Sequence, residues 1–287
     1  MTFDYIYNEA VRTLEKAGVP NAALDAWYLL SYAFGIDRAR WLLVRHDPVT
    51  DEQKADCFRR LTALRAERVP LQQITGTQDF MGLTFRVHEN VLIPRQDTET
   101  LVEALLRDVS SPAVSGAPIR LLDMCTGSGC IGISAAALLG AERADVTLAD
   151  ISEAALAAAT ENIKLNGVKA NCRAVRSDLF AAFDGQFFDV IACNPPYIKT
   201  ADIPGLMPEV KDHEPHAALD GGADGLSFYR RIGEEAPACL APAGSIYLEI
   251  GCSQAREVTE ILSRNGFKDI EVIKDMCGHD RVVRARI

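Results

Sequence analysis

The sequence predicts an α/β fold with a doubly wound, mostly parallel sheet, preceded by a small domain made of helices. Three observations carry this prediction. From residue 119 onward, short apolar segments typical of buried strands alternate with segments of helical periodicity. Residues 1–68 contain helical patterns only. Between these parts, a stretch from Pro70 alternates in polarity and contains Gly76 and Gly82, which indicates a β-hairpin.

The N-terminal part of the chain is expected to form a bundle of four helices. Residues 3–18 place apolar side chains at spacings of three and four and end on a glycine. Asn21 precedes a second helical segment and can cap it, and a short third helix is expected around Arg38–Arg45. Thr50 and Gln53 match a capping box that opens a fourth helix. The tryptophans and tyrosines of these segments are expected to lie in the core.

The later part of the chain is expected to form the sheet. Pro94 ends an extended segment, and Asp97 or Thr98 begins a helix. Two further helices are expected at residues 130–140 and 153–167. The expected strands are residues 119–124, 145–150, 174–178, 188–194, 245–250, 268–274 and 280–287. Strands that alternate with helices form parallel sheets with right-handed crossovers, so we predict a doubly wound sheet.

These changes of pattern set the expected domain boundaries. We predict a helical domain at residues 1–68 and a β-hairpin linker at residues 69–92. The α/β domain is expected at residues 93–287. No internal repeat or low-complexity segment interrupts it.

The composition and the charge limit the possible classes of protein. The 287 residues are 48% hydrophobic and 24% charged, and no apolar run is long enough to span a bilayer. The N-terminal residues include acidic side chains and no basic segment, so we expect a cytoplasmic protein without a signal peptide. The net charge is −10, and its acidic excess lies after Arg68. Because an acidic body repels phosphate backbones, we expect no stable binding to nucleic acid. We also expect no membrane association, and a monomer.

Cysteine and histidine are too scattered to suggest a disulfide framework or a metal site. The eight cysteines contain no C-x-x-C pair, so we expect reduced, mostly buried thiols. His213 and His216 are close in sequence, but Pro215 between them breaks the helix that would align them. We expect a polar loop there and no metal.

A glycine-rich loop follows the first expected strand of the sheet. Gly127, Gly129 and Gly132 form the pattern G-x-G-x-x-G, and Asp150 ends the next strand. In doubly wound sheets, ligands bind outside the carboxyl ends of the strands. Glycines let the backbone turn tightly against a ligand, and a carboxylate can accept hydrogen bonds from both hydroxyls of a ribose. The loop therefore predicts a nucleoside cofactor.

Two kinds of nucleoside cofactor fit this loop, and acidic residues help to separate them. A nicotinamide dinucleotide would place a pyrophosphate at the helix N-terminus, whereas S-adenosylmethionine carries a positive sulfonium and no phosphate. Asp123 lies beside the loop and suits a positive group better than a pyrophosphate. Asp178 ends the third strand, where it can accept from the amino group of an adenine. Each acid alone is more often a turn residue, but together with Asp150 they favour S-adenosylmethionine.

The fourth expected strand ends in the sequence C-N-P-P-Y-I. Proline cannot continue a central strand, so the strand stops before Pro195 and Pro196, which stiffen the chain. If the Asn194 side-chain oxygen and the Pro195 carbonyl converge, they fit a donor with two N–H bonds, such as a carboxamide or an exocyclic amine of a base. Tyr197 offers a flat face for stacking on such a group. The motif predicts catalysis by orientation, without a nucleophilic Ser or Cys.

Four segments of the chain resemble one known family. They are I-P-R-Q-D-T-E at residues 93–99, D-M-C-T-G-S-G at residues 123–129, N-P-P-Y at residues 194–197 and E-P-H-A-A-L-D-G-G-A-D-G-L at residues 214–226. N-P-P-Y alone is shared with adenine DNA and guanine RNA methyltransferases, whereas the first and last segments together are much more specific. Over nearly its whole length, the chain resembles the peptide chain release factor glutamine methyltransferases of the HemK/PrmC type.

The resemblance implies a fold, an activity and a set of site residues. The fold would be a class I S-adenosylmethionine-dependent methyltransferase, Rossmann-like, with a seven-stranded sheet whose last strand inserts antiparallel. The activity would be methyl transfer from S-adenosyl-L-methionine, leaving S-adenosyl-L-homocysteine, to the glutamine nitrogen of the Gly-Gly-Gln loop of release factors. The helical domain would bind the release factor. Family cofactor contacts carry over to Cys125, Thr126, Gly127, Ser128, Gly129, Asp150, Leu179 and Asn194, and substrate contacts to Asn194, Pro195, Pro196 and Tyr197. Of these, Asn194, Pro195 and Tyr197 are the expected catalytic residues.

Three positions depart from the commonest family pattern. Cys125 stands where the first loop glycine is usual, so a positive φ there would be strained. Gln96 replaces a frequent proline, and Leu179 replaces an aromatic residue found in some members. Since none of them changes N-P-P-Y, we expect altered cofactor affinity at most.

Other functions remain open at this point. A methyltransferase that acts on a ribosomal-protein glutamine would carry nearly the same motifs. An exocyclic amino group of RNA or DNA would also donate to Asn194 and Pro195, although the acidic body weighs against nucleic acid. The remaining alternatives are a noncatalytic, translation-associated binding module and a nicotinamide enzyme.

Overall fold

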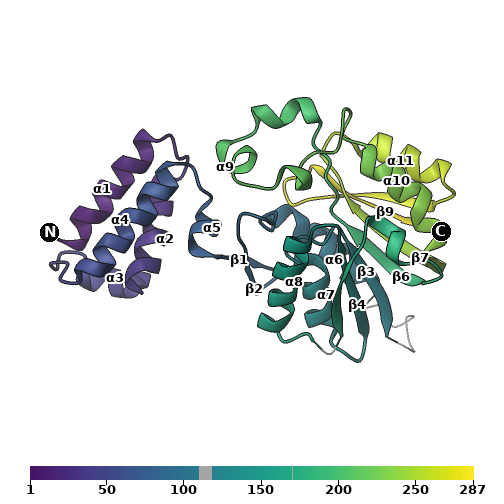
Figure 1. Cartoon of the computed structure of the whole chain (residues 1–287), viewed down its shortest axis with the longest axis horizontal. Coiled ribbons are helices and arrows are strands. Elements are labelled where there is room, and N and C mark those ends of the chain that lie inside the picture. Colours follow the sequence, from purple (N-terminus) through teal and green to yellow (C-terminus); the bar gives the residue numbers. More distant parts are fainter. Residues whose placement is uncertain (110–117, 170) are drawn as a thin grey trace. The chain divides into compact units, whose positions relative to one another are not determined.

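The computed structural model describes residues 1–109, 118–169 and 171–287. It divides into two compact units, and each is described by itself (Figure 1). Unit 1 contains residues 1–76 and 207–213, and unit 2 contains residues 77–206 and 214–287. The inclusion of residues 207–213 in unit 1 was not indicated by the sequence pattern.

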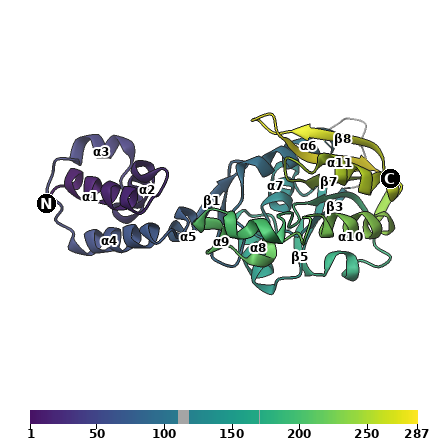
Figure 2. The same cartoon turned by 90° about the horizontal axis from the view of Figure 1, so that it is seen from above.

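Unit 1 is a helical bundle. Its helices are α1 (Phe3–Lys16), α2 (Ala22–Phe34), α3 (Arg38–Val44), α4 (Glu52–Ala66), α5 (Leu71–Thr75) and the short α9 (Pro208–Lys211). The packing of α1 and α2 can be followed in Figure 2. Trp27 and Trp41 are buried in the core between the helices, as expected, together with Phe58. The same prediction was wrong for Tyr5, Tyr28 and Tyr32, which are exposed. The four expected helices are therefore present.

Two local predictions in this part of the chain were wrong in detail. Asp51, not Thr50, caps α4, because its carboxylate accepts a hydrogen bond from the Lys54 main-chain nitrogen at 3.0 Å. The hairpin expected from Pro70 is shorter than its sequence pattern. Leu71 and Ile74 lie one helical turn apart in α5 and pack against the bundle core, so this turn buries apolar surface as a helix.

Unit 2 contains a two-stranded hairpin and the seven-stranded sheet. The hairpin is β1 (Thr77–Phe80) and β2 (Leu83–Arg86). The strands of the large sheet are β3 (Ile119–Met124), β4 (Ala144–Asp150), β5 (Cys172–Arg176), β6 (Phe188–Cys193), β7 (Leu240–Glu249), β8 (Lys268–Lys274) and β9 (Asp280–Arg286). Their order is β5-β4-β3-β6-β7-β9-β8, and β9 runs antiparallel to both of its neighbours. The predicted seven-stranded, mostly parallel sheet with an antiparallel last strand is confirmed.

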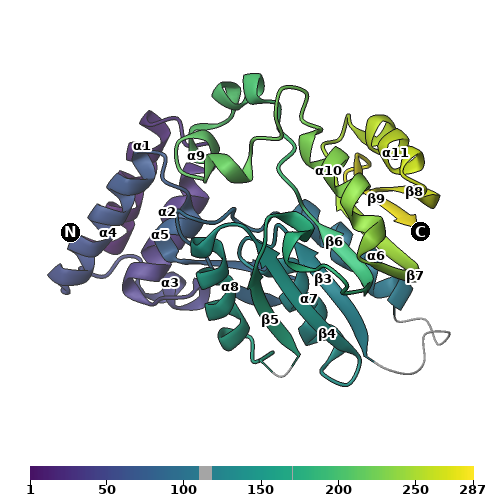
Figure 3. The ribbon, with the colours of Figure 1, turned by 45° about the vertical axis from the view of Figure 1, so that its right-hand side comes forward.

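Helices cover both faces of the sheet. The α-helices of unit 2 are α6 (Glu99–Val109), α7 (Cys130–Leu139), α8 (Glu153–Leu165), α10 (Ser227–Glu235) and α11 (Ala255–Arg264). Short 3-10 helices are η1 (Gln96–Thr98), η2 (Leu179–Ala182), η3 (Thr200–Gly205), η4 (His216–Ala218) and η5 (Ala236–Ala238). Figure 3 shows α10 and α11 next to the β7–β9 end of the sheet.

The two faces form separate apolar cores because side chains alternate along each strand. Leu121 packs in the core with α6, α7 and α8, whereas its neighbour Leu122 packs in the core with α10 and α11. The strands β3, β4, β5, β6 and β7 run parallel, so their carboxyl ends meet at one edge of the sheet, where the predicted site residues lie. No helix among the described residues is long and apolar enough to cross a membrane.

Candidate active site

A cavity of about 350 Å³ lies at the carboxyl ends of the parallel strands. Seven of the predicted site residues line it: Cys125, Gly127, Asp150, Asp178, Leu179, Asn194 and Pro196. Six predicted residues within the described chain lie outside its lining: Asp123, Thr126, Ser128, Gly129, Pro195 and Tyr197. The structure thus brings the carboxyl ends of four strands together around one cavity.

The glycine loop has the backbone that its sequence predicts. Gly127 and Gly129 have φ values of 54° and 84°, and Cys125 has a φ of 56°, in the region that a side chain strains. Gly132 has a different role, since an added Cβ would lie 2.3 Å from Leu148 Cδ2. The glycine there lets α7 pack directly on β4.

Asp123 stabilises this loop without lining the cavity. Its side chain is fully buried, and Oδ2 accepts hydrogen bonds from Thr126 Oγ1 at 2.5 Å and from the Gly132 main-chain nitrogen at 2.9 Å. Burial raises the pKa of this carboxyl to about 7, against the opposing effect of these two hydrogen bonds. The carboxylate joins the start of the loop to the first turn of α7.

Two other predicted acids reach the cavity. Asp150 Oδ2 accepts from the Gly127 main-chain nitrogen and Oδ1 from that of Ser152, both at 2.9 Å. Burial raises the pKa of Asp150. Asp178 is more exposed, and its carboxylate pairs with Arg231 at 2.9 Å. Asp150 therefore fixes the loop and still presents its carboxylate to a ligand.

Several residues in the lining had no role in the sequence analysis. They are Asn90, Val91, Leu92, Met124, Ile151, Ser152, Ala155, Ser177, Pro215, Ala217, Ala218, Phe228 and Arg231. Pro215, Ala217 and Ala218 belong to the segment at residues 214–226, so the family motif was the available signal. Phe228 lies beyond that motif, and nothing in its local pattern marks it as a cavity residue.

Two motif segments that are far apart in the sequence meet at Glu214. Its side chain is almost fully buried; Oε2 pairs with Arg95 at 2.5 Å, and Oε1 accepts from the Ile93 main-chain nitrogen at 3.4 Å. Burial raises the pKa of Glu214, and Arg95 opposes this rise. The contact fixes the segment at residues 93–99 against the one at residues 214–226.

The N-P-P-Y backbone is held by close packing with two glycines. A Cβ on Gly221 would lie 2.8 Å from Tyr197 Cα, and one on Gly225 would lie 2.5 Å from the Tyr197 carbonyl oxygen. The same carbonyl accepts a hydrogen bond from Gln254 Nε2 at 3.1 Å. The glycines of residues 214–226 are therefore needed for close approach to N-P-P-Y. Gln254 was missed by the sequence analysis.

The side chains of N-P-P-Y contact buried polar groups. Asn194 Nδ2 lies 3.4 Å from Thr98 Oγ1, and Tyr197 Oη lies 3.5 Å from Glu249 Oε1. Burial raises the pKa of Tyr197, and so does the neighbouring Glu249 carboxylate. Within the described residues, no hydrogen-bond donor reaches the Pro195 carbonyl oxygen. Asn194 Oδ1 and this carbonyl are both acceptors available to a ligand.

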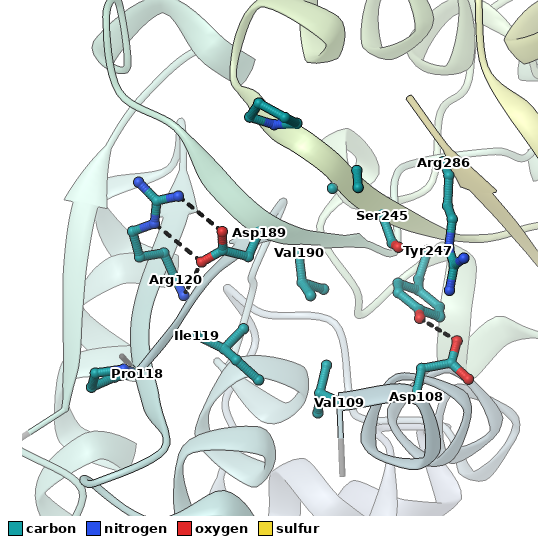
Figure 4. Close-up of a pocket in the computed structure, with 13 residues that line it drawn as sticks. Asp108, Val109, Pro118, Ile119, Arg120, Asp189, Val190, Ser245, Tyr247 and Arg286 are labelled. Carbon is teal, nitrogen blue, oxygen red and sulfur yellow. Dashed lines mark hydrogen bonds and ion pairs between the residues drawn. The ribbon is translucent and has the colours of Figure 1, made fainter. Parts of the chain in front are cut away.

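A second cavity, of about 630 Å³, lies at the opposite end of the strands (Figure 4). Arg120 and Asp189 face each other there as an ion pair at 2.9 Å, and Tyr247 donates to Asp108 at 2.6 Å. Its lining contains none of the predicted site residues. The cavity at the carboxyl ends is therefore the candidate active site.

The fold and the cavity define a class I methyltransferase. Residues 96–207 match the protein family described as "Methyltransferase small domain", and residues 6–76 match the family described as "PrmC N-terminal domain". A solved structure described as a methyltransferase from Pyrococcus furiosus is 20% identical, with a TM-score of 0.51 over 71% of this chain and 89% of that chain. That similarity shows the fold alone.

Curated relatives identify the family. The release factor glutamine methyltransferase of Geobacter sulfurreducens is 44% identical, covering 96% of this chain and 93% of the relative. The protein of the same name from Cereibacter sphaeroides is 41% identical, covering 97% of this chain and 96% of the relative. The chain belongs to the release factor glutamine methyltransferase family, which confirms the resemblance seen in its motifs.

Proposed function

We propose that this protein transfers the methyl group of S-adenosylmethionine to the side-chain amide nitrogen of the glutamine in the Gly-Gly-Gln loop of peptide chain release factors. One observation carries the proposal. Asn194 lines the cavity at the carboxyl ends of the strands and is the first residue of N-P-P-Y, whose stiff backbone is held by Gly221, Gly225 and Gln254. The residue that would hold the substrate amide is thus part of the wall of the cavity that would hold the methyl donor.

The lining of the cavity fits S-adenosylmethionine. Asp150 offers a carboxylate to ribose hydroxyls, and Asp178 is an acceptor for an adenine amino group. Leu179 and Phe228 supply apolar surface for a flat base. When bound, this cofactor supplies an electrophilic methyl group on a sulfonium. Asp123 would act indirectly, because its buried carboxylate holds the loop.

The chain's own residues would orient the substrate amide. Asn194 Oδ1 and the Pro195 carbonyl oxygen would each accept one N–H of a glutamine –NH₂ group. Holding both N–H bonds fixes the plane of the amide and increases electron density on its nitrogen. Tyr197 would stack on the planar group. Orientation of this kind contributes up to about 7–11 kcal/mol in intramolecular models.

The domain roles follow from the same proposal. Residues 1–68 would bind the release factor, and residues 93–287 would catalyse methyl transfer. Residues 69–92 would connect these two domains. The protein would act as a monomer in the cytoplasm. Its acidic charge of −10 supports a protein substrate over nucleic acid.

The test uses purified protein, methyl-labelled S-adenosylmethionine and a release factor. We expect label on the wild-type release factor and none on the variant with Gln→Ala in its Gly-Gly-Gln loop. Asn194→Ala should lower kcat by about 100-fold or more while cofactor binding remains within a few fold. Equal labelling of both release factors, or label on RNA that survives protease, would refute the proposal.

A further inference from the structure

A buried carboxylate lies directly behind N-P-P-Y. Glu249 is the last residue of β7 and is 1% exposed. The register pairs Cys193 of β6 with Leu248 of β7, so Asn194 and Glu249 follow these partners at neighbouring strand ends. Burying a carboxylate is costly unless polar groups face it. The groups that face Glu249 therefore indicate what it does.

Both functional side chains of N-P-P-Y connect to this carboxylate. Tyr197 Oη donates to Glu249 Oε1 at 3.5 Å. The hydroxyl of Thr98, which is 2% exposed, lowers the pKa of the same carboxylate. Thr98 Oγ1 in turn lies 3.4 Å from Asn194 Nδ2. Such contacts are often long without substrate and shorten when it binds.

The chemistry of these groups determines which atom donates and which accepts in each contact. An ionised carboxylate can only accept hydrogen bonds, so the single proton of the Thr98 hydroxyl points to Glu249. The oxygen of Thr98 can then only accept from Asn194, through the amide Nδ2. The amide oxygen Oδ1 is left on the other side of the Asn194 side chain. That orientation is the one a substrate N–H requires.

We propose that Glu249 is a positioning residue that, through Thr98, turns the Asn194 amide so that Oδ1 faces the substrate –NH₂ group. Through its contact with Tyr197, the same carboxylate anchors the stacking ring. The proposal rests on the proposed function, because it assigns Oδ1 as the substrate acceptor. It also gives a role to Thr98, which the sequence analysis named only as a possible start of a helix and as part of the motif at residues 93–99.

The ionisation of Glu249 should then appear in the pH profile. Burial raises the pKa of Glu249 to about 7, and Thr98, Arg281 and Tyr197 oppose the rise. The titratable and charged groups around it are Arg281 and its ion-pair partner Asp97, Tyr197, Tyr229, whose hydroxyl donates to the Glu249 main-chain oxygen, and Cys130. Once protonated, Glu249 becomes a donor, and the direction set by Thr98 is lost. Turnover should fall as pH decreases through 7.

Isosteric variants separate this role from a purely structural one. Glu249→Gln places a donor against Thr98, whose proton can then point to Asn194 Oδ1. We expect kcat to fall by about 100-fold, with the cofactor Kd within threefold and no further decrease of kcat below pH 7. Thr98→Val should reduce kcat similarly, Thr98→Ser should restore it, and the double variant Glu249→Gln/Thr98→Val should lose little more than either single variant.

The outcomes distinguish this inference from the proposed function. If the wild-type protein methylates release factors and Glu249→Gln keeps kcat within threefold, the inference is wrong and the proposed function stands. If the wild-type protein fails to methylate release factors, the proposed function is wrong. The orientation is then tested by the NMR signals of the Asn194 side-chain NH₂, assigned with Asn194→Asp. Slow hydrogen exchange that is lost in Thr98→Val supports the contact, and unchanged exchange overturns it.

Discussion

Replacing Glu209 with glutamine should weaken the attachment of residues 207–213 to the helices of unit 1. The Glu209 side chain is 12% exposed and lies between two arginines. Its Oε1 accepts from Arg65 at 2.8 Å, and Arg68 binds both carboxylate oxygens, at 2.7 and 2.6 Å. Arg65 also pairs with Asp25 at 2.7 Å, so it keeps one partner in the variant.

The expected loss can be worked out from the pKa of Glu209. Burial acts to raise the pKa of this carboxyl, but the hydrogen bonds and charges of Arg68 and Arg65 outweigh it and lower the pKa from 4.5 to about 2. This difference in pKa corresponds to about 3 kcal/mol. Water screens part of the interaction, so we expect a loss of about 2 kcal/mol in unfolding free energy at pH 7. That value lies below the 3–5 kcal/mol typical of breaking fully buried pairs.

The assay is urea unfolding of the full chain followed by tryptophan fluorescence. The two tryptophans, Trp27 and Trp41, both lie in unit 1, so fluorescence reports on that unit. Asp56→Asn is a matched control, because Asp56 is 61% exposed and its pair with Arg59 lies on the surface of α4. The control should lose less than about 0.5 kcal/mol.

The pH dependence supplies the decisive comparison. A lowered pKa stabilises the folded protein fully above 4.5, and this contribution is lost as pH falls from 4.5 toward 2. The difference between wild type and Glu209→Gln should shrink over the same range. Equal stability of Glu209→Gln and Asp56→Asn at pH 7 refutes the reasoning.

The remaining predictions concern the glycine loop. Gly132→Ala would place a methyl group 2.3 Å from Leu148 Cδ2, so thermal unfolding should show a loss of about 1–3 kcal/mol. Gly205→Ala is its control, with no atom within 4 Å of the added methyl, and equal losses would contradict the packing role of Gly132. Asp123 has a raised pKa of about 7, so its burial costs stability as pH rises from 3.8 to 7. Without cofactor, Asp123→Asn should be more stable than wild type by up to about 4 kcal/mol at pH 8 and equal to it near pH 4, as measured by denaturant unfolding; equality at pH 8 argues against this.

Most of the fold could be predicted because its strands and helices carry strong local patterns. The strand expected at residues 119–124 is β3 without any change, and the strand at residues 268–274 is β8. Helices α10 and α11 were not predicted. Residues 207–213 lie between unit 2 segments in the sequence. The ion pairs of Glu209 and a hydrogen bond from Gln73 Nε2 to the His213 main-chain oxygen at 2.8 Å join them to the helices of unit 1. Pairing of this kind depends on contacts far apart in sequence, which no local pattern contains.

Site residues could be predicted from the sequence where they lie at the carboxyl end of a recognisable strand. Asp150 and Asn194 were recognised in this way, and both line the cavity. Asp123 was recognised by the same rule, but its side chain turns back to Thr126 and α7 instead of lining the cavity. Strand position gives the level of a side chain along the sheet, and packing with the next helix decides which way it points.

Glu249 shows why a buried acid in a strand escapes sequence analysis. In S-I-Y-L-E-I it follows an apolar run. A charged residue at that position usually indicates that the strand ends there and faces solvent. Its burial follows from strand order, because β7 lies between β6 and β9 and Arg281 of β9 acts on the carboxylate. The same order places Glu249 beside the end of β6, where Asn194 begins N-P-P-Y. The orientation of the catalytic amide would therefore be encoded in the sheet topology, by a strand that contributes no residue to the cavity lining.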